Sequence, residues 1–194
     1  MPYRFSGGLR KDNRHNPAGD GAYMKYPKVV VTGHFNSGKT ELIRTVSEIS
    51  IVTTETKRTD GRIGEKSTTT VVMDFGRVTV DLDTIVYLFG TPGQERFDFM
   101  WEILSKNMLG FVVMVDSTNR DGILDTGKII SYFKEISDVP YIIVANKQDL
   151  ANAAHPEEIR EVLGLSAEDQ VVPCVANNPF QASAVIRAIL SEII

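Results

Sequence analysis

Short apolar runs alternate with amphipathic stretches along most of the chain, beginning at Lys28. Strands alternating with helices form a mostly parallel sheet with helices on both faces. We therefore expect a three-layer α/β fold with a mostly parallel six-stranded sheet and one antiparallel edge strand. The predicted strands cover residues 28–32, 71–80, 84–89, 111–115, 141–144 and 171–172, and helical spacing follows Lys39 and recurs over 123–136, 156–163 and 181–193.

Two parts of the chain lack this periodicity. Residues 1–24 are rich in Gly, Asn, Asp, Arg and Lys, which predicts a flexible N-terminal extension before one domain over 25–194. The segment from about Ser50 to Ser67 is polar, and it predicts a long functional loop.

Composition narrows the classes of protein. The chain has 42% hydrophobic and 24% charged residues and a net charge of -4, which is ordinary for a globular domain and argues against nucleic acid as the main partner. Cys174 is the single cysteine, so an internal disulfide is excluded. The chain has no apolar run of membrane-spanning length, and neither Pro2 nor the last residues offer a lipidation site. We expect a cytoplasmic protein with no membrane anchor of its own.

One motif predicts a phosphate-binding loop between the first strand and the first helix. Its glycines allow the backbone N–H groups to approach phosphate oxygens, and the following helix N-terminus adds positive potential. We expect Lys39 to reach the β- and γ-phosphates and Thr40 to ligate Mg²⁺, with Glu41 next to the loop. The motif is Gly33-His34-Phe35-Asn36-Ser37-Gly38-Lys39-Thr40.

A second motif, Asn146-Lys147-Gln148-Asp149, directly follows a buried strand. The Asp149 carboxylate can accept two parallel hydrogen bonds from a guanine base, and adenine offers no such pair of donors. We expect the stem of Lys147 to lie over the base and Asn146 to brace the neighbouring loops. An exposed charged turn is the alternative interpretation.

A third motif, Gly90-Thr91-Pro92-Gly93-Gln94-Glu95-Arg96-Phe97, ends the strand over 84–89. The N–H of Gly93 can approach a γ-phosphate, and Gln94 has the chemistry to orient an attacking water. A Pro-Gly turn that caps a helix is the alternative, and Arg96 is either a transition-state cation or a surface residue. The apolar residues after Gln94 either pack beneath a helix or form an effector surface.

Three threonines, Thr68-Thr69-Thr70, precede the strand over 71–80. One of their hydroxyls can ligate Mg²⁺ while a γ-phosphate is present, and entry into a strand is the alternative role. These elements stand in the order found in Ras-like small GTPases, and the chain most resembles the prokaryotic MglA-like GTPases. The likeness rests on V-T-G-H-F-N-S-G-K-T, T-T-T-V-V-M-D-F-G and F-G-T-P-G-Q-E-R-F.

The resemblance implies a P-loop GTPase fold, binding of GTP and GDP with Mg²⁺, slow hydrolysis with Gln94, Lys39 and Gly93 as catalytic residues, and a molecular switch. It also implies a Roadblock/LC7-type protein as partner and makes Thr70 the metal-binding threonine. The last base-contacting loop of such proteins has its counterpart in Val175-Ala176-Asn177, where the N–H of Ala176 is expected to reach the guanine carbonyl oxygen. A nucleotide-gated binding module with negligible hydrolysis is the alternative function.

Most Ras-like proteins carry an Asp where this chain has Gly90. The hairpin over 71–80 and 84–89 turns near Leu82, and antiparallel pairing about that centre brings Asp74 opposite Gly90. We therefore expect Asp74 to supply the missing carboxylate and to bind a Mg²⁺-bound water. The alternative is that Asp74 binds a local hydroxyl or faces solvent.

Overall fold

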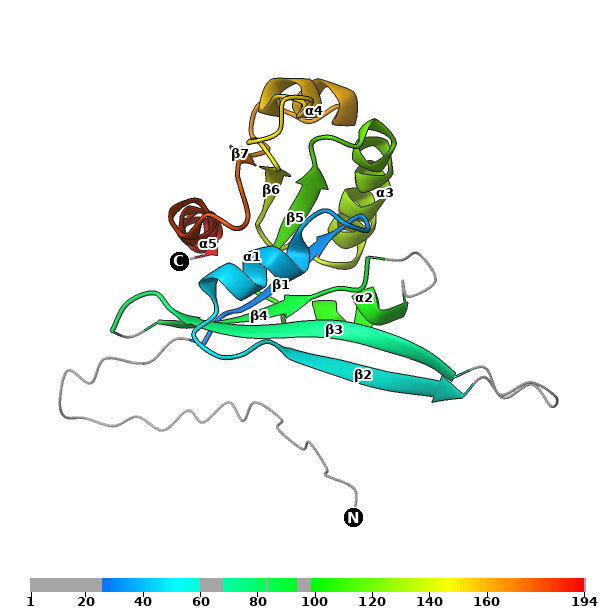
Figure 1. Cartoon of the computed structure of the whole chain (residues 1–194), viewed down its shortest axis with the longest axis vertical. Coiled ribbons are helices and arrows are strands. Elements are labelled where there is room, and N and C mark those ends of the chain that lie inside the picture. The colour runs from blue at the N-terminus through cyan, green and yellow to red at the C-terminus, as the bar shows by residue number, and fades with distance from the viewer. Residues whose placement is uncertain (1–25, 60–67, 83, 94–98, 194) are drawn as a thin grey trace, which may run out of the picture.

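The computed structural model describes residues 26–59, 68–82, 84–93 and 99–193. Within these ranges the chain forms twelve helices and strands, which alternate except for the three consecutive strands β2, β3 and β4 (Figure 1). They are β1 Lys28–Gly33, α1 Lys39–Val46, β2 Val52–Thr59, β3 Thr68–Thr79, β4 Ile85–Gly90, α2 Phe99–Ser105, β5 Gly110–Asp116, α3 Arg120–Ile136, β6 Tyr141–Asn146, α4 Pro156–Leu163, β7 Val171–Pro173 and α5 Pro179–Ile193.

The strands form one sheet in the order β2-β3-β4-β1-β5-β6-β7. β1 pairs in parallel with β4 and β5, and the parallel pairing continues through β6 to β7. β3 is antiparallel to both of its neighbours, β2 and β4. The predicted α/β fold with a mostly parallel sheet is confirmed, and the described part of the sheet contains one strand more than expected.

That additional strand is β2, which occupies part of the segment predicted to be a loop. It pairs with β3 from Val52 opposite Phe75 to Thr59 opposite Thr68, so the loop prediction was wrong for these residues. β2 also forms one edge of the sheet, and the antiparallel β3, which was expected at that edge, lies one position inside it. The sequence Val-Thr-Thr-Glu-Thr-Lys-Arg-Thr contains a single apolar residue, so hydrophobic periodicity offers no signal there.

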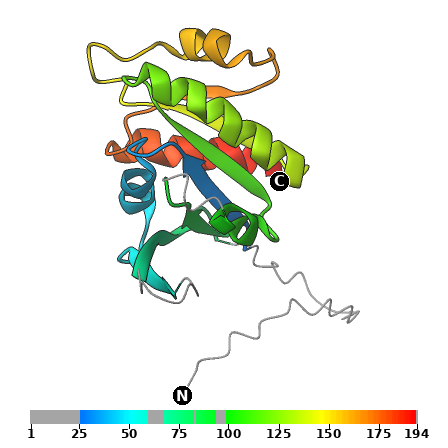
Figure 2. The same ribbon diagram turned by 90° about the vertical axis from the view of Figure 1, so that its right-hand side faces the viewer.

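Helices cover both faces of the sheet (Figure 2). On one face α1 and α5 pack against alternate residues of the central strands, such as Val31, Leu88 and Met114. On the other face α2, α3 and α4 pack against the intervening residues, such as Val30 and Val113. Every residue of β5 is buried, because helices cover the strand on both faces. Its sequence is accordingly apolar up to the final residue, Asp116.

The parallel strands β1, β4, β5, β6 and β7 all end at the same edge of the sheet. The loops that follow them carry the motifs singled out above, and ligands bind at this edge in open α/β sheets. Asn119 caps α3 by accepting a hydrogen bond from the Gly122 N–H at 3.1 Å, and Asn178 caps α5 in the same way. These caps begin two helices beside the candidate site. None of the described helices is both long and apolar enough to cross a membrane.

Candidate nucleotide-binding site

The loop between β1 and α1 wraps tightly because three of its residues have positive φ. Gly33 and Gly38 have φ values of 139° and 97°, and Asn36 has a φ of 62°. A Cβ at Gly33 would lie 2.2 Å from the Met114 carbonyl oxygen, and one at Gly38 would lie 2.2 Å from the Asn146 side chain. Only glycine fits at these two positions, as a phosphate-binding loop requires.

Lys39 begins α1 and turns its side chain back across this loop. Its ammonium group donates hydrogen bonds to the carbonyl oxygens of Gly33 at 2.9 Å and His34 at 2.8 Å. The side chain is 7% exposed. Burial lowers the pKa of Lys39 to about 8, and the nearby charge of Asp74 offsets this only in part. The loop therefore holds a desolvated cation at its centre.

Asp74 lies in β3, directly opposite the last residue of β4, and its side chain contacts Thr40. The predicted pairing of Asp74 with Gly90 is confirmed. The Thr40 hydroxyl donates a hydrogen bond of 2.6 Å to Asp74 Oδ2, and Asp74 is buried. Asp74 thus contacts a local hydroxyl, which was the alternative interpretation, but that hydroxyl belongs to the residue expected to bind Mg²⁺. Carboxylate and hydroxyl oxygens are the hard ligands that suit this ion.

Gly90 leaves room for the Asp74 side chain. A Cβ at Gly90 would lie 3.1 Å from Asp74 Cβ and 2.9 Å from Ile43 Cδ1. An aspartate at this position would therefore compete with Asp74 for the same space. The lack of a carboxylate at residue 90 and the presence of one at residue 74 are linked by packing.

Gly93 lies against the phosphate-binding loop. A Cβ there would be 2.7 Å from Lys39 Nζ and 2.8 Å from Phe35 Cα. Phe35 itself is exposed.

Gln94, Arg96 and Phe97, which were expected beside Gly93, lie outside the described residues. Thr70 lies in β3 opposite Lys57, where the backbone alone is described.

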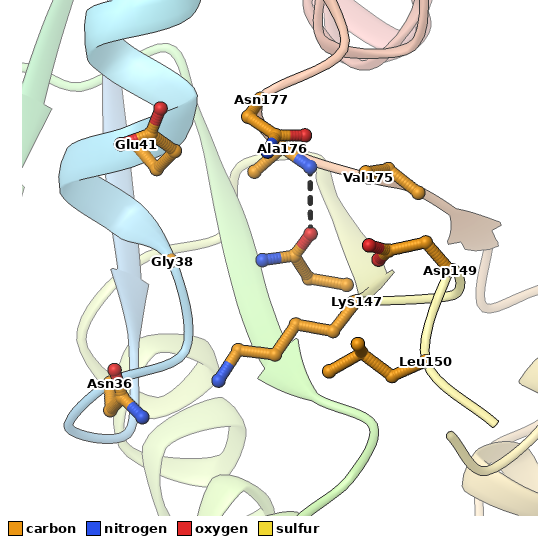
Figure 3. A pocket seen from close by; sticks show the side chains of 10 residues that line it. Asn36, Gly38, Glu41, Lys147, Asp149, Leu150, Val175, Ala176 and Asn177 are labelled. Carbon is orange, nitrogen blue, oxygen red and sulfur yellow. Dashed lines mark hydrogen bonds between the residues drawn. The ribbon is translucent and has the colours of Figure 1, made fainter. Parts of the chain in front are cut away.

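A cavity of about 260 Å³ opens between α1 and the loops that follow β6 and β7 (Figure 3). It brings together nine residues expected at the nucleotide site and adds Leu150. The ten lining residues are Asn36, Gly38, Glu41, Asn146, Lys147, Asp149, Leu150, Val175, Ala176 and Asn177.

Asn146 connects the loops around this cavity through its side-chain amide. Nδ2 donates to the Ser37 carbonyl oxygen at 2.9 Å. Oδ1 accepts from the Ala176 N–H at 2.9 Å, the bond drawn as a dashed line in Figure 3. One buried side chain thereby joins the loops after β1, β6 and β7. The Ala176 N–H is already used, so a guanine carbonyl oxygen would have to share this donor with Asn146.

Asp116 is a residue of the site that belongs to none of the sequence motifs. It ends β5 directly opposite Asn146, and its Oδ2 accepts a hydrogen bond of 2.5 Å from Lys147 Nζ. Oδ1 accepts from the N–H and the hydroxyl of Thr118. Burial raises the pKa of the Asp116 carboxyl, but the bonds from Lys147 and Thr118 outweigh it and hold that pKa below its ordinary value. A polar residue at the end of a fully apolar strand was the available signal.

The described residues of the apolar stretch expected after Gln94, Phe99 to Trp101, are all half-buried. Met100 and Trp101 pack against the core beneath α2. Ile103 of the same helix is 53% exposed. A second cavity of about 310 Å³ lies beside them and is lined by His34, Gly93, Trp101, Asp125, Lys128, Ile129 and Tyr132.

Comparison with known proteins adds a family to this geometry. Residues 50–192 match a sequence profile described as conserved hypothetical ATP-binding protein. An uncharacterized protein of Methanocaldococcus jannaschii is 33% identical to this chain over 125 residues, which cover 64% of this chain and 72% of the relative. The profile match begins after the phosphate-binding loop, so the interpretation of residues 33–40 depends on their sequence and geometry.

Proposed function

This chain belongs to the family of conserved hypothetical ATP-binding proteins, and we propose that it binds GTP and GDP with Mg²⁺ and acts as a molecular switch. The observation that carries the proposal is the cavity in which Asp149 and Lys147 lie beside the phosphate-binding loop. A purine nucleotide has a flat base at one end and charged phosphates at the other. The two halves of this site match those two chemistries.

The choice of guanine over adenine depends on Asp149. An ionised carboxylate only accepts hydrogen bonds, and guanine presents two adjacent donors, its N1–H and its exocyclic amine. Adenine presents an unprotonated nitrogen in place of the first donor, which repels the carboxylate. The description of the family names ATP, whereas Asp149 favours guanine. Substitution of Asp149 is therefore the change that distinguishes ATP binding from GTP binding.

Mg²⁺ fits the same end of the site as the phosphates. Such ions keep several waters and bind proteins through one or two oxygen ligands in addition to the phosphates. Thr40 would supply a direct ligand, Asp74 would hold a metal-bound water, and Thr70 would join them when a γ-phosphate is present. The ion would neutralise charge that develops on the phosphates during hydrolysis.

For the hydrolytic step, Lys39 and the N–H of Gly93 would bind the γ-phosphate while Gln94 orients the attacking water. The resemblance to MglA-like GTPases extends the proposal to a Roadblock/LC7-type partner at the loops that contact the γ-phosphate. A binding module with negligible hydrolysis is the second candidate, and Gly90 favours it because a carboxylate is missing there. Single-turnover measurement of GTP hydrolysis, with and without the partner, separates the two.

The test of base recognition is a competition experiment with the Asp149→Asn variant. An amide offers a donor that matches the additional carbonyl of xanthine, so the variant should lose guanine affinity by roughly 100-fold and gain affinity for XDP. Displacement of labelled GDP by unlabelled GDP, ATP or XDP measures these affinities in the unmodified protein and in the variant. Equal displacement by ATP and GDP in the unmodified protein would contradict guanine specificity.

A further inference from the structure

Lys147 leaves the end of β6 in a left-handed conformation, with a φ of 66°. Residues that carry a Cβ rarely adopt this backbone conformation, so something in the fold maintains it. The turn sends the side chain back along the cavity wall, and Figure 3 shows the stem extended with its ammonium group directed away from Asp149.

The far end of that stem is held by Asp116. The Nζ–Oδ2 distance is 2.5 Å, and the Asp116 side chain is 5% exposed while that of Lys147 is 24% exposed. Asp116 cannot move to follow the lysine, because it ends a fully buried strand and is bonded on its other oxygen to Thr118. The buried partner therefore dictates where the lysine lies.

From this geometry we infer that Asp116 is a positioning residue for the nucleotide base, acting through Lys147. It holds the four methylene groups of Lys147 as a straight apolar platform before any base arrives. This inference rests on the proposed nucleotide site, but it does not depend on which purine binds, because either ring offers the same flat face.

The physical advantage lies in the ordering of a flexible side chain. A free lysine has many rotamers, and a base that stacks on it must restrict them at a cost in affinity. An ammonium group already bonded to Asp116 removes that cost. We therefore expect loss of the bond to speed nucleotide release and leave the discrimination by Asp149 unchanged.

The experiment measures the dissociation rate of fluorescently labelled GDP from four proteins. Asp116→Asn keeps the size of the side chain and an oxygen for Thr118 but no longer attracts the ammonium group, so release should be roughly tenfold faster. Lys147→Met keeps an apolar stem that needs no anchor. In the Lys147→Met background, Asp116→Asn should therefore change the rate by less than twofold.

Thr118→Val is the matched control, because it removes the hydroxyl bond to Asp116 Oδ1, while the Thr118 backbone N–H still holds that oxygen and Lys147 stays bonded to the other. Its release rate should stay within about twofold of the unmodified protein. Thermal unfolding without nucleotide is measured for every variant. A role limited to the fold would lower the unfolding midpoint and give additive rate changes in the double variant.

The outcomes separate the inference from the proposed function. If labelled GDP binds and Asp116→Asn releases it at the normal rate, or if the two substitutions are additive, Asp116 does not act through Lys147. If the unmodified protein binds labelled ATP and not GDP, guanine specificity fails and the same four proteins test Asp116 with ATP. If neither nucleotide binds, both ideas are wrong.

Discussion

The Asp74 carboxylate accepts a hydrogen bond from the Thr40 hydroxyl, and it can also act on a Mg²⁺ ion bound to that hydroxyl. Its contact with Thr40 places a carboxylate behind the hydroxyl that we propose as a Mg²⁺ ligand. A carboxylate in this position both orients the hydroxyl and adds negative charge near the metal. Two variants can separate these two contributions.

We predict that Asp74→Ala raises the Mg²⁺ concentration needed for half-maximal GTP binding by roughly tenfold, because a charged hydrogen-bond acceptor is lost. Asp74→Asn keeps an oxygen that can accept the Thr40 hydrogen bond but removes the charge. A Mg²⁺ requirement between those of the unmodified protein and Asp74→Ala would therefore assign the remaining part of the effect to the charge. Titration of Mg²⁺ against GTP affinity measures both. An unchanged requirement in Asp74→Ala would show that this carboxylate does not serve the metal.

Returning the carboxylate to residue 90 requires a third change. Even without the Asp74 carboxylate, a Cβ at Gly90 remains 2.9 Å from Ile43 Cδ1. Ile43→Val removes that methyl group, so Asp74→Ala/Gly90→Asp/Ile43→Val is the appropriate rescue protein. Recovery of the normal Mg²⁺ requirement would indicate that either strand can supply the charge.

Among the elements, α3 contains two glycines whose surroundings differ. A Cβ at Gly127 would meet only Leu163 Cδ2 at 3.6 Å, which is ordinary contact. A Cβ at Gly122 would lie 2.7 Å from the Asn119 side chain that caps the helix and 3.3 Å from His34 Nδ1. The first glycine lies on an open side of the helix, and the second makes room for the cap and the phosphate-binding loop.

We predict that Gly127→Ala stabilises the protein by about 0.5–1 kcal/mol, because alanine restricts the unfolded chain and favours the helix. Gly122→Ala should destabilise it by about 1 kcal/mol, because the cap must move. Urea unfolding of the two variants under identical conditions compares them directly. If both substitutions stabilise the protein, the Asn119 side chain can move away from a Cβ at residue 122 without loss of the cap, and the prediction for Gly122 is wrong.

The elements also show which parts of the fold were predictable. Buried strands such as β5 have uninterrupted apolar sequences, and the register of Asp74 with Gly90 followed from the position of one turn. β2 was missed because an edge strand can be held by backbone hydrogen bonds to β3 without an apolar face. Nine of the ten residues that line the cavity between α1 and the loops after β6 and β7 were expected to share one site, from the motifs and from the family resemblance together. Asp116 belongs to no motif, and its contact with Lys147 could be found only in the structure.

For the whole molecule, the stability of the nucleotide-free protein should depend on the protonation of Lys39. Its pKa is about 8 in the folded protein and 10.5 in the unfolded chain. Between these values the unfolded state binds a proton that the folded state does not, so the free energy of unfolding rises with pH. The cost of burying the charged form is fully present below pH 8 and is gone above 10.5.

We predict that the free energy of unfolding of the unmodified protein, relative to that of Lys39→Met, increases by about 3 kcal/mol between pH 8 and 10.5. Denaturant unfolding of both proteins without nucleotide, at several pH values, gives this difference. Groups other than Lys39 titrate in both proteins and cancel. Parallel pH profiles would mean that the loop accommodates the charged lysine without cost.

The shared space of Asp74 and Gly90 also limits how related sequences can diverge. A protein with its carboxylate on β4 cannot acquire a second one on β3 without crowding, and removal of the first would leave the proposed Mg²⁺ site without a carboxylate. The two positions are therefore expected to change as a pair, with a small residue at one whenever the other is acidic. In a lineage, this single packing contact would appear as a correlated exchange between two residues sixteen positions apart in the sequence, with few surviving intermediates.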